Sequence, residues 1–325
     1  TIIGPLYAVT DANGAYAFDN LMPGVYTVTE VLQAGWYNVT PLSREVTLIE
    51  GSEVTCVKFG NVEYSSIDGW KFLDWDMDQT KDGDEPGIPG WEITLEGWLN
   101  DGLFPLGMDF YMTGCTHIGP ITIATGEDGS WEFPDLLPGI YWVSEATVEG
   151  WYHTTPTMVP LWVISGSHIV DIKFGNVPYT CFNGYKVEDT NGNGQWDKDE
   201  LGLPGWTIVV EGFQNDGVFF HQEYVTDEGG YWETGYDLLP GTYWVNETMQ
   251  DGWIATSQAS YYFEIPMAME NEQYGFVFLN FELGEISGYK YEDMNGNGIL
   301  DDGDLPIEGW VITLSGPMSA TATTD

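Results

Sequence analysis

The sequence has very few positive charges. Its 325 residues include 8 Lys and Arg against 51 Asp and Glu, which gives a formal net charge of −43. A nucleic acid or an anionic membrane surface needs a basic face, so neither is expected as a partner. Long apolar runs are also missing, and we expect no membrane insertion in this segment. The chain is nevertheless not a disordered acidic tail, because 43% of its residues are hydrophobic and 15% are aromatic.

Cysteine and histidine are scarce as well. The cysteines stand at unlike positions in the repeats, so they share no disulfide framework, and one pair or an interchain bridge stays open. The histidines do not recur, and we expect them at the surface rather than in catalysis. These residues are Cys56, Cys115, Cys181, His117, His153, His168 and His221. Without a nucleophile elbow, phosphate-binding loop or zinc motif, the sequence predicts no enzyme that turns over a substrate.

Three blocks of sequence recur along the chain. The first joins a Gly-aromatic-Lys motif to an acidic loop, the second runs through a Pro-Gly turn to Tyr-x-Val-x-Glu, and the third ends in Phe-Gly-Asn or Phe-Leu-Asn. The first starts at 67, 182 and 286, the second covers 10–30, 125–145 and 226–247, and the third covers 58–61, 173–176 and 278–280. Residues 67–181 and 182–285 each contain all three blocks, which predicts two complete domains.

The terminal segments contain complementary parts of the same unit. Residues 1–66 carry the second and third blocks, and residues 286–325 carry the first. We expect the former to be the C-terminal part of a domain and the latter the N-terminal part. Either the chain is a slice of a longer tandem polypeptide, or separate copies complete one another head to tail. A cut at arbitrary points is the simpler alternative.

Apolar and polar residues alternate, as in half-buried β-strands. Trp91, Ile93 and Leu95 share one face, and the pattern returns at 206–210 and 310–314. Short strands, frequent turns and units of this length predict an all-β fold. The expected architecture is a rod of tandem immunoglobulin-like β-sandwich domains, with the first and last domains split between the chain ends.

One unit carries an insertion. The stretch 97–129 is longer than its counterpart 212–230. We expect an extended hairpin there, which is either a contact surface or a loop without a role. The extra piece includes Phe110, Tyr111, Cys115 and His117.

Each first block leads into an acidic loop with oxygen-bearing side chains at positions 1, 3, 5, 9 and 12. Position 7 is expected to offer its backbone carbonyl. Such a spacing of oxygen ligands, without His or Cys, indicates structural calcium. The expected ligands are Asp74, Asp76, Asp78, Thr80, Asp82 and Glu85, then Asp189, Asn191, Asn193, Gln195, Asp197 and Glu200, then Asp293, Asn295, Asn297, Ile299, Asp301 and Asp304. Gln79 at the usual glycine position and the short Asp304 predict looser first and third sites. The alternative is an Asx-rich turn without an ion.

Three of the seven lysines occupy one repeat position: Lys71, Lys186 and Lys290. Strand parity puts them on the core face, where a lone ammonium needs a partner or a chemical fate. Two further polar residue types recur with inward parity. They are Glu30, Glu145 and Glu247, and Asn61, Asn176 and Asn280.

Together these motifs resemble the collagen-adhesin B-type superfamily along the whole chain. They are similar to the calcium-binding B repeats of serine-aspartate surface proteins and to isopeptide-forming pilin domains. The resemblance implies an extracellular protein, on the cell surface or in an extracellular filament of a prokaryote.

The pilin resemblance also implies that each lysine condenses with an asparagine to form an isopeptide bond, assisted by a glutamate. Carried over by position, the sets are Lys71, Glu145 and Asn176, then Lys186, Glu247 and Asn280, then Lys290 with Glu30 and Asn61 of the adjoining repeat. In an apolar pocket a neutral amine attacks the amide while a neutral acid polarises it. The alternative is a buried ion pair hydrogen-bonded to asparagine. The serine-aspartate repeats are not known for such bonds, so both interpretations stay open.

The sequence therefore predicts a structural protein of a filament, sheath or stalk, with copies of itself as partners. An adhesin or carbohydrate-binding array, with a glycan or matrix ligand, is the alternative, and an accessory region of a secreted enzyme is a third. Sequons at Asn38 and Asn246 predict glycan sites. The tryptophans at 36, 151 and 253 are expected to pack in or beside the core rather than stack on sugars.

Overall fold

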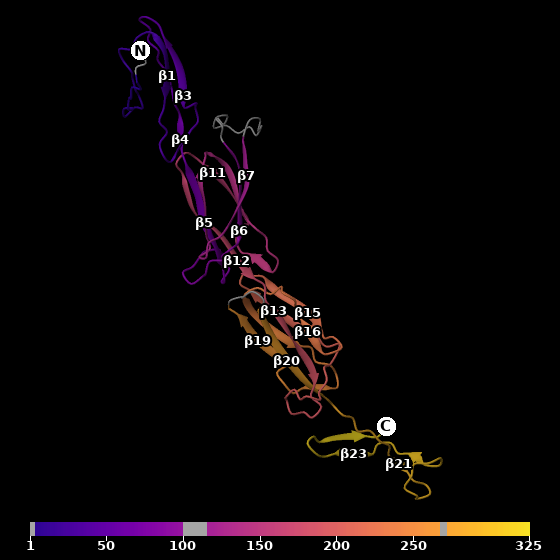
Figure 1. Cartoon of the computed structure of the whole chain (residues 1–325). Helices are drawn as coiled ribbons and strands as arrows, with labels where there is room; N and C mark the ends of the chain where they lie inside the picture. Colours follow the sequence, from indigo (N-terminus) through magenta and orange to yellow (C-terminus); the bar gives the residue numbers. More distant parts are fainter. Residues whose placement is uncertain (1–3, 100–115, 267–271) are drawn as a thin grey trace.

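The protein consists of β-strands arranged in successive units along an elongated molecule (Figure 1). The computed structural model describes residues 4–99, 116–266 and 272–325, and these ranges contain no helix. The predicted all-β fold of tandem β-sandwiches is confirmed. Within the described ranges there is accordingly no apolar helix that could cross a membrane.

Residues 65–178 form a sandwich of two four-stranded sheets. Its strands are β5 (Ser65–Leu73), β6 (Glu92–Leu99), β7 (His117–Ala124), β8 (Ser130–Leu136), β9 (Gly139–Glu145), β10 (Trp151–His153), β11 (Met158–Val163) and β12 (His168–Pro178). The sheet orders are β10-β12-β5-β8 and β11-β9-β6-β7. The first and last strands, β5 and β12, pair in parallel at the centre of one sheet. This pairing closes the unit.

Residues 181–282 repeat this topology. The strands are β13 (Cys181–Glu188), β14 (Thr207–Gln214), β15 (Phe219–Val225), β16 (Tyr231–Glu233), β17 (Gly241–Glu247), β18 (Trp253–Ala255), β19 (Ser260–Ile265) and β20 (Gln273–Glu282). The sheet orders are β16-β13-β20-β18 and β15-β14-β17-β19, and β13 pairs in parallel with β20. Each strand therefore has a counterpart in the preceding sandwich.

The alternating residues form the two cores. In the first sandwich Trp91, Ile93 and Leu95 are buried, and in the second Trp206 and Ile208 take the same places. Full burial of one large apolar side chain contributes about 1.5–3 kcal/mol relative to exposure. A strand shifted by one residue would lose that contribution along its whole length, so the alternation fixes which face points inward.

The glycine of the Gly-aromatic-Lys motif permits the parallel contact. A Cβ atom added to Gly69 would lie 2.0 Å from the carbonyl oxygen of Ile172, and one added to Gly184 would lie 2.0 Å from that of Phe276. Only glycine allows the last strand to approach the first this closely. The third copy of the motif differs, because Gly288 has open space around it.

The two complete sandwiches meet at an apolar contact. Met77, from the loop after β5, and Val177, near the end of β12, belong to one buried cluster with Leu239 of the following unit. Beside it, the backbone N–H of Thr180 donates to the carbonyl of Leu238 over 2.8 Å. The acidic loop of one unit thus lies at the junction with the next.

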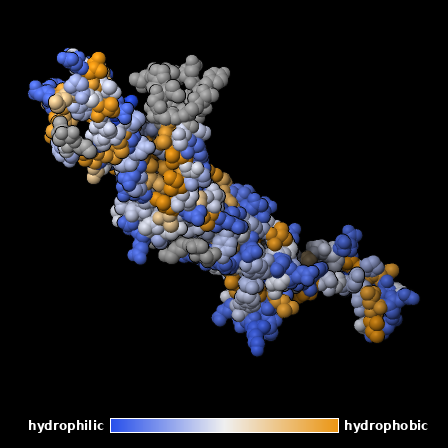
Figure 2. All heavy atoms as spheres, turned by 45° about the horizontal axis from the view of Figure 1, so that its top comes forward, coloured by the Kyte–Doolittle hydropathy of each residue, from blue (hydrophilic) through white to orange (hydrophobic). Residues whose placement is uncertain are grey.

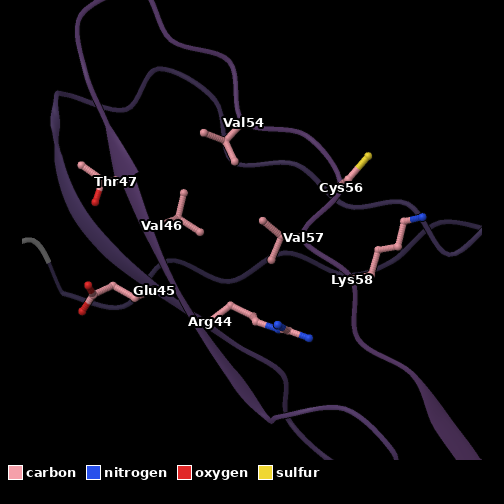
Figure 3. Close-up of a pocket in the computed structure, with 8 residues that line it drawn as sticks. All are labelled: Arg44, Glu45, Val46, Thr47, Val54, Cys56, Val57 and Lys58. Carbon is pink, nitrogen blue, oxygen red and sulfur yellow. The ribbon is translucent and has the colours of Figure 1, made fainter.

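The N-terminal segment contains part of a sandwich. Its strands are β1 (Gly24–Thr29), β2 (Trp36–Asn38), β3 (Ser43–Leu48) and β4 (Asn61–Glu63). β1 pairs with β3 and β2 with β4, as β9 pairs with β11 and β10 with β12. A cavity of about 440 Å³ opens between β3 and residues 54–58, with Arg44 and Val46 on one side and Val57 on the other (Figure 3). By repeat position, 54–58 correspond to 169–173, which pair with the first strand of a complete sandwich.

The C-terminal segment has a different part of the fold. Its strands are β21 (Tyr291–Glu292), β22 (Leu305–Pro306), β23 (Val311–Leu314) and β24 (Ala320–Thr323), paired as β21-β22 and β23-β24. The expectation that the 310–314 face is buried is wrong here. Trp310 is 52% exposed, whereas Trp206 is 2% exposed, because no described element covers this face. Figure 2 shows apolar side chains at the surface of this segment, at lower right.

Most of the predicted hairpin insertion lies outside the described residues. Phe110, Tyr111 and Cys115 fall in the stretch 100–115. His117, at the start of β7, lies with its ring centroid 4.7 Å from that of Trp98.

Candidate metal loops and buried lysine sites

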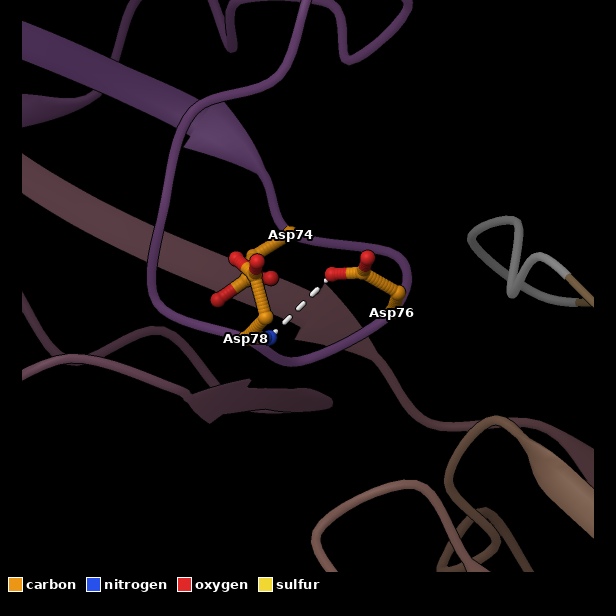
Figure 4. A group of neighbouring side chains, drawn as sticks. All are labelled: Asp74, Asp76 and Asp78. Carbon is orange, nitrogen blue, oxygen red and sulfur yellow. Dashed lines mark hydrogen bonds between the residues drawn. The ribbon is translucent and has the colours of Figure 1, made fainter.

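The loop after β5 brings three carboxylates together. Ligand atoms of Asp74, Asp76 and Asp78 lie within 4.8 Å of one another, and Figure 4 shows the three side chains around one turn of the loop. Asp74 is buried, and its Oδ1 has no hydrogen-bond partner among the described residues. Like charges this close repel one another unless a cation lies between them. These residues therefore fit a hard cation such as calcium.

All three acidic loops are closed by the same pair of hydrogen bonds. The carboxylate at position 12 accepts from the backbone N–H groups of positions 2 and 9, over 2.9–3.1 Å. Glu85 and Glu200 do this in the first two loops, and Asp304 does it in the third. The shorter aspartate thus closes its loop as the glutamates do, and its length does not loosen this contact.

The side chains at positions 1, 3 and 5 also keep the same partners in each loop. Position 1 accepts from the N–H of position 6, position 3 from that of position 5, and position 5 from that of position 7. The residues at position 7 are Thr80, Gln195 and Ile299. The backbone N–H of each position 7 residue is hydrogen-bonded within the loop. The backbone carbonyl of the same residue is the group that was predicted to face the ion.

In the second and third loops, positions 3, 5 and 9 converge. The amide Nδ2 atoms of Asn191 and Asn193 each lie 2.8 Å from Asp197 Oδ2. Asn297 Nδ2 lies 2.7 Å from Asp301 Oδ2 in the third loop. In these two loops, amide N–H groups donate to the carboxylate at position 9. The first loop has carboxylates at positions 3, 5 and 9, so it has no amide group to donate there.

Charge and hydrogen bonding act differently on the position 1 carboxyls. Burial, together with the neighbouring charges of Asp76 and Asp78, raises the pKa of Asp74 above its usual value. In the third loop, N–H donors, foremost that of Gly298, lower the pKa of Asp293. The carboxyls at position 1 of the first and third loops therefore shift in opposite directions, and the looser first site expected from Gln79 stays a prediction.

Positions 4 and 6 have left-handed backbone in every loop. Glycines occupy them in the second and third loops, but the first loop has Met77 with φ 61° and Gln79 with φ 70°. The glycines are Gly192, Gly194, Gly296 and Gly298. The packing of the Met77 side chain against Leu239 at the junction offsets the strain of its left-handed backbone. Gln79 is exposed and has no such contact in the cluster.

Lys71 is buried in the first sandwich as strand parity predicted. Its Nζ lies 2.9 Å from Glu145 Oε2 and donates to the carbonyl of Phe174 over 3.2 Å. The same atom lies 4.5 Å from the ring centroid of Trp91. Burial lowers the pKa of Lys71 to about 8, although Glu145 acts in the opposite direction.

Lys186 has the same surroundings in the second sandwich. Its Nζ lies 3.0 Å from Glu247 Oε2 and 4.4 Å from the ring centroid of Trp206. Burial again lowers the pKa of the lysine to about 8, against the opposing effect of Glu247. The side chains of both ion pairs are fully buried.

The predicted asparagines lie on the neighbouring strand. Asn176 is two residues beyond Phe174, which is the partner of Lys71 in the parallel β5–β12 register, and so shares the inward face of the sheet. Asn280 has the same relation to Lys186 through β13 and β20. The Oδ1 atoms of both asparagines are buried without a hydrogen-bond partner among the described residues. Each sandwich thus contains a lysine, a glutamate and an asparagine at the positions that the resemblance implied.

The third set is divided between the two ends of the molecule. Asn61 Nδ2 donates to Glu30 Oε2 over 3.0 Å, and Glu30 Oε1 is buried without a partner in the described part of the chain. Lys290 Nζ lies 4.8 Å from the ring centroid of Trp310. Within one chain the structure does not bring this lysine to Glu30 and Asn61 (Figure 1).

His153 is a site residue that the sequence argument missed. The expectation of a surface position is wrong, since its side chain is 18% exposed and Nδ1 lies 2.9 Å from Glu145 Oε1. The same Nδ1 lies 3.2 Å from Asn176 Nδ2. The counterpart positions hold Ala255 and Asn38, so recurrence could not have found this histidine.

The tryptophans at 151 and 253 make edge contacts with Trp91 and Trp206, at centroid distances of 5.2 and 5.6 Å. These contacts favour a packing role for the two tryptophans over a sugar-stacking role. The sequon residues Asn38 and Asn246 are half-buried, and glycosylation stays a prediction. Among the described cysteines, Cys56 is exposed and Cys181 is buried, and neither is in a disulfide.

The repeated sandwiches, acidic loops and buried lysines define a tandem immunoglobulin-like β-sandwich protein. Serine-aspartate repeat-containing protein D of Staphylococcus aureus (strain Newman) is 26% identical over 98% of this chain, and the match covers 26% of that protein. The corresponding protein F of Staphylococcus epidermidis is 25% identical over 97% of this chain and 20% of its own length. Colossin-A of Dictyostelium discoideum is 26% identical over 77% of this chain and 2% of its own length.

The chain is homologous to the serine-aspartate repeat-containing proteins and spans about a quarter of the length of protein D. No family model matches it. Among solved structures, the Bacillus anthracis TIE protein has a TM-score of 0.32 at 19% identity, covering 83% of this chain and 44% of that one. The shaft pilin SpaA of Lactobacillus rhamnosus GG has a TM-score of 0.28 at 13% identity, covering 70% and 100%. The similarity to the serine-aspartate repeat-containing proteins places the chain outside the cell, at the cell surface.

The strain at Gln79 gives a testable expectation. Replacing Gln79 with Gly should raise the free energy of unfolding of the first complete sandwich by about 0.5–1 kcal/mol. A left-handed φ disfavours a side chain by about 1–2 kcal/mol, and the greater freedom of glycine in the unfolded chain offsets about 0.5–1 kcal/mol of that gain. Thermal and denaturant unfolding in metal-free buffer measure the change. Gly192→Ala, which adds a side chain at the left-handed position 4 of the second loop, should lower stability by a similar amount. A lower stability of Gln79→Gly would contradict the assignment of strain.

Proposed function

We propose that the chain is a segment of an extracellular structural array in which each complete sandwich closes itself by a Lys–Asn isopeptide bond. The observation that carries this is the double occurrence of a buried lysine against a buried glutamate and an inward asparagine on the adjoining strand. The pairs are Lys71 with Asn176 and Lys186 with Asn280. A bond between the first and last strands would tie the two ends of a unit together, so that pulling on the chain could not separate them.

The chemistry follows from the surroundings of the amine. An ordinary lysine is almost wholly protonated at neutral pH, but Lys71 and Lys186 have a pKa of about 8, so about a tenth of each amine is the neutral nucleophile at pH 7. The amine attacks the asparagine Cγ, the Cγ–Nδ2 bond breaks, and ammonia leaves. One proton passes from Nζ to Nδ2, and the adjoining glutamate carboxyl is within reach of the lysine nitrogen.

Intact mass under denaturing conditions tests the bonds. The wild-type chain should be lighter than its sequence mass by two molecules of ammonia. Lys186→Met and Glu247→Gln should each restore one ammonia by removing the second bond, whereas Lys198→Met, at an exposed lysine, should keep both losses. Because the amine is protonated below its pKa, bond formation in freshly synthesised protein should quicken as pH rises towards 8. A wild-type mass equal to the sequence mass would refute the proposal.

Calcium forms the second part of the proposal. The residues that would hold it are the oxygen-bearing side chains and position 7 carbonyls of the three loops, and the ion would supply charge neutralisation rather than chemistry. Support comes from the crowded carboxylates of Asp74, Asp76 and Asp78 and from the unpartnered Asp74 Oδ1. An ion here would also brace Met77 at the junction between sandwiches.

Removing calcium should lower the thermal midpoint. With free calcium at a hundred times its Kd, binding stabilises the folded chain by about 2.7 kcal/mol per site. Calorimetry with calcium and with a chelator measures the difference. Asp78→Ala should reduce it, whereas Asp84→Asn, at an exposed acid of the same loop outside the ligand positions, should not. An identical midpoint with and without calcium would contradict calcium stabilisation.

As its partner, we propose a second copy of the chain bound head to tail. Residues 286–325 of one copy would cover the open part-sandwich at residues 24–63 of the next, with Ile286 taking the core place of Ile67 and Phe182. Ile286 is 82% exposed, whereas both counterparts are 0% exposed. The cavity beside residues 54–58 lies where such a first strand would pack (Figure 3). Lys290 would then meet Glu30 and Asn61.

Gly288→Ala tests this association. The variant should leave the isolated chain unchanged, because no atom lies within 4 Å of the added Cβ. It should abolish association, because the same change at Gly69 or Gly184 would put a Cβ 2.0 Å from a carbonyl oxygen of the last strand. Light scattering and denaturing gels measure the multimers. Gly284→Ala, also in open space, is the matched control. A wild-type chain that stays monomeric at high concentration would overturn the head-to-tail partner.

A further inference from the structure

An unbroken series of polar contacts runs through the first lysine site. Lys71 Nζ lies 2.9 Å from Glu145 Oε2, Glu145 Oε1 lies 2.9 Å from His153 Nδ1, and this nitrogen lies 3.2 Å from Asn176 Nδ2. The four side chains come from β5, β9, β10 and β12, and the β10–β12 register sets His153 opposite Asn176. The series begins at the nitrogen that would attack and ends at the nitrogen that would leave.

Isopeptide formation requires one proton to leave the attacking nitrogen and one to reach the departing nitrogen. The attacking amine must lose one as its bond to Cγ forms, and Nδ2 must gain one to depart as ammonia. An unprotonated amide nitrogen is a poor leaving group, so a general acid beside Nδ2 lowers the barrier. Glu145 touches the first nitrogen, and His153 touches the second.

We infer that His153 is a catalytic residue of the first site, which donates the proton to the departing Asn176 Nδ2 and recovers it through Glu145. As the Nζ–Cγ bond forms, Nζ gives a proton to Glu145 Oε2. The Nδ1 proton of His153 passes to Nδ2, the Cγ–Nδ2 bond breaks, and ammonia leaves. The proton on Glu145 then returns to Nδ1, so the glutamate and histidine end as they began. This inference rests on the isopeptide bond of the proposed function.

The second sandwich provides a natural comparison. Its register sets Ala255 opposite Asn280, and Asn280 Nδ2 donates to Met249 Sδ over 3.6 Å. Neither side chain can donate a proton. The ion pair, the tryptophan and the lysine pKa of about 8 are otherwise the same. The second site thus has the nucleophile and the glutamate without the acid at the leaving group.

The titratable groups around His153 are few. Glu145 touches it from β9, Lys71 lies beyond that glutamate on β5, and Asp74, after β5, acts electrostatically on Lys71. The first site therefore depends on a neutral lysine and on an Nδ1 proton of His153. At both sites the rate should rise with pH towards the lysine pKa of about 8.

Site-resolved kinetics test the inference. The full chain is made by cell-free synthesis, samples are quenched over time at several pH values, and proteolysis with mass spectrometry follows the Lys71–Asn176 and Lys186–Asn280 products separately. His153→Ala should slow the first site at least ten-fold, given that general acids contribute about 10²–10⁴-fold, and should leave the second site unchanged. Ala255→His should accelerate the second site. His153→Gln, which keeps a polar side chain without proton transfer, should be as slow as His153→Ala.

The outcomes separate the two proposals. If neither site loses ammonia in the wild type, the isopeptide function itself fails. If both bonds form and His153→Ala keeps the wild-type rate and pH profile, the role of His153 fails while the bond stands. Recovery of the rate by His153→Gln would mean that His153 only positions Asn176, and would also overturn the inference. Misfolding is not expected to confuse the result, because alanine already occupies this place in the second sandwich.

Discussion

The structure depends on the burial of a lysine inside each sandwich. Removing an ammonium from water is unfavourable unless an anion meets it at short range, and loss of either partner leaves an uncompensated charge in the core. The glutamate that meets Lys71 comes from the opposite sheet, and the asparagine comes from the parallel neighbour. The contact of Lys71 with Glu145 therefore joins the two sheets, and its hydrogen bond to the Phe174 carbonyl ties the last strand to the first. An apolar core could tolerate other arrangements of the same strands, but this one cannot slip in register without stranding the charge.

The three acidic loops keep one backbone geometry with different residues. The backbone N–H groups donate to the side chains at positions 1, 3, 5 and 12 in the same way in all three loops. Their residues nevertheless differ, with glutamate or aspartate at position 12 and carboxylate or amide at positions 3 and 5. The first loop departs furthest, since it has more carboxylates and places Met77 in a left-handed conformation that glycine adopts elsewhere. That methionine packs against the next unit. The departure coincides with a contact between sandwiches, which suggests that this loop serves the junction as well as its own domain.

Much of this arrangement was predictable from the sequence because it repeats. Period-two alternation gave the strand faces around Ile93 and Ile208, and recurrence picked out Lys71, Glu145 and Asn176 before any of them could be seen together. A search for recurring residues cannot find a site residue that occurs in one unit only. His153 is such a residue, and it was therefore expected at the surface. Alternation failed at Trp310 for another reason, since a strand pattern describes the face that a complete sandwich would bury and not whether the covering sheet is present. The spacing of Asp74, Asp76 and Asp78 predicted that their carboxylates converge, but the burial of Asp74 and its unpartnered Oδ1 were visible only in three dimensions.

Each half of the divided third set makes some of its contacts alone. Lys290 lies over Trp310, as Lys71 lies over Trp91, and among the described residues no carboxylate forms an ion pair with it. At the other end, Asn61 Nδ2 donates to Glu30 Oε2, and the second oxygen of that glutamate has no hydrogen-bond partner among the described residues. In each complete sandwich the lysine also lies over a tryptophan, beside the glutamate that it meets. The contact between lysine and tryptophan therefore does not require the glutamate. Side chains that such contacts already hold lose less rotamer freedom when the Lys–Glu contact forms, which reduces the entropic cost of burying them.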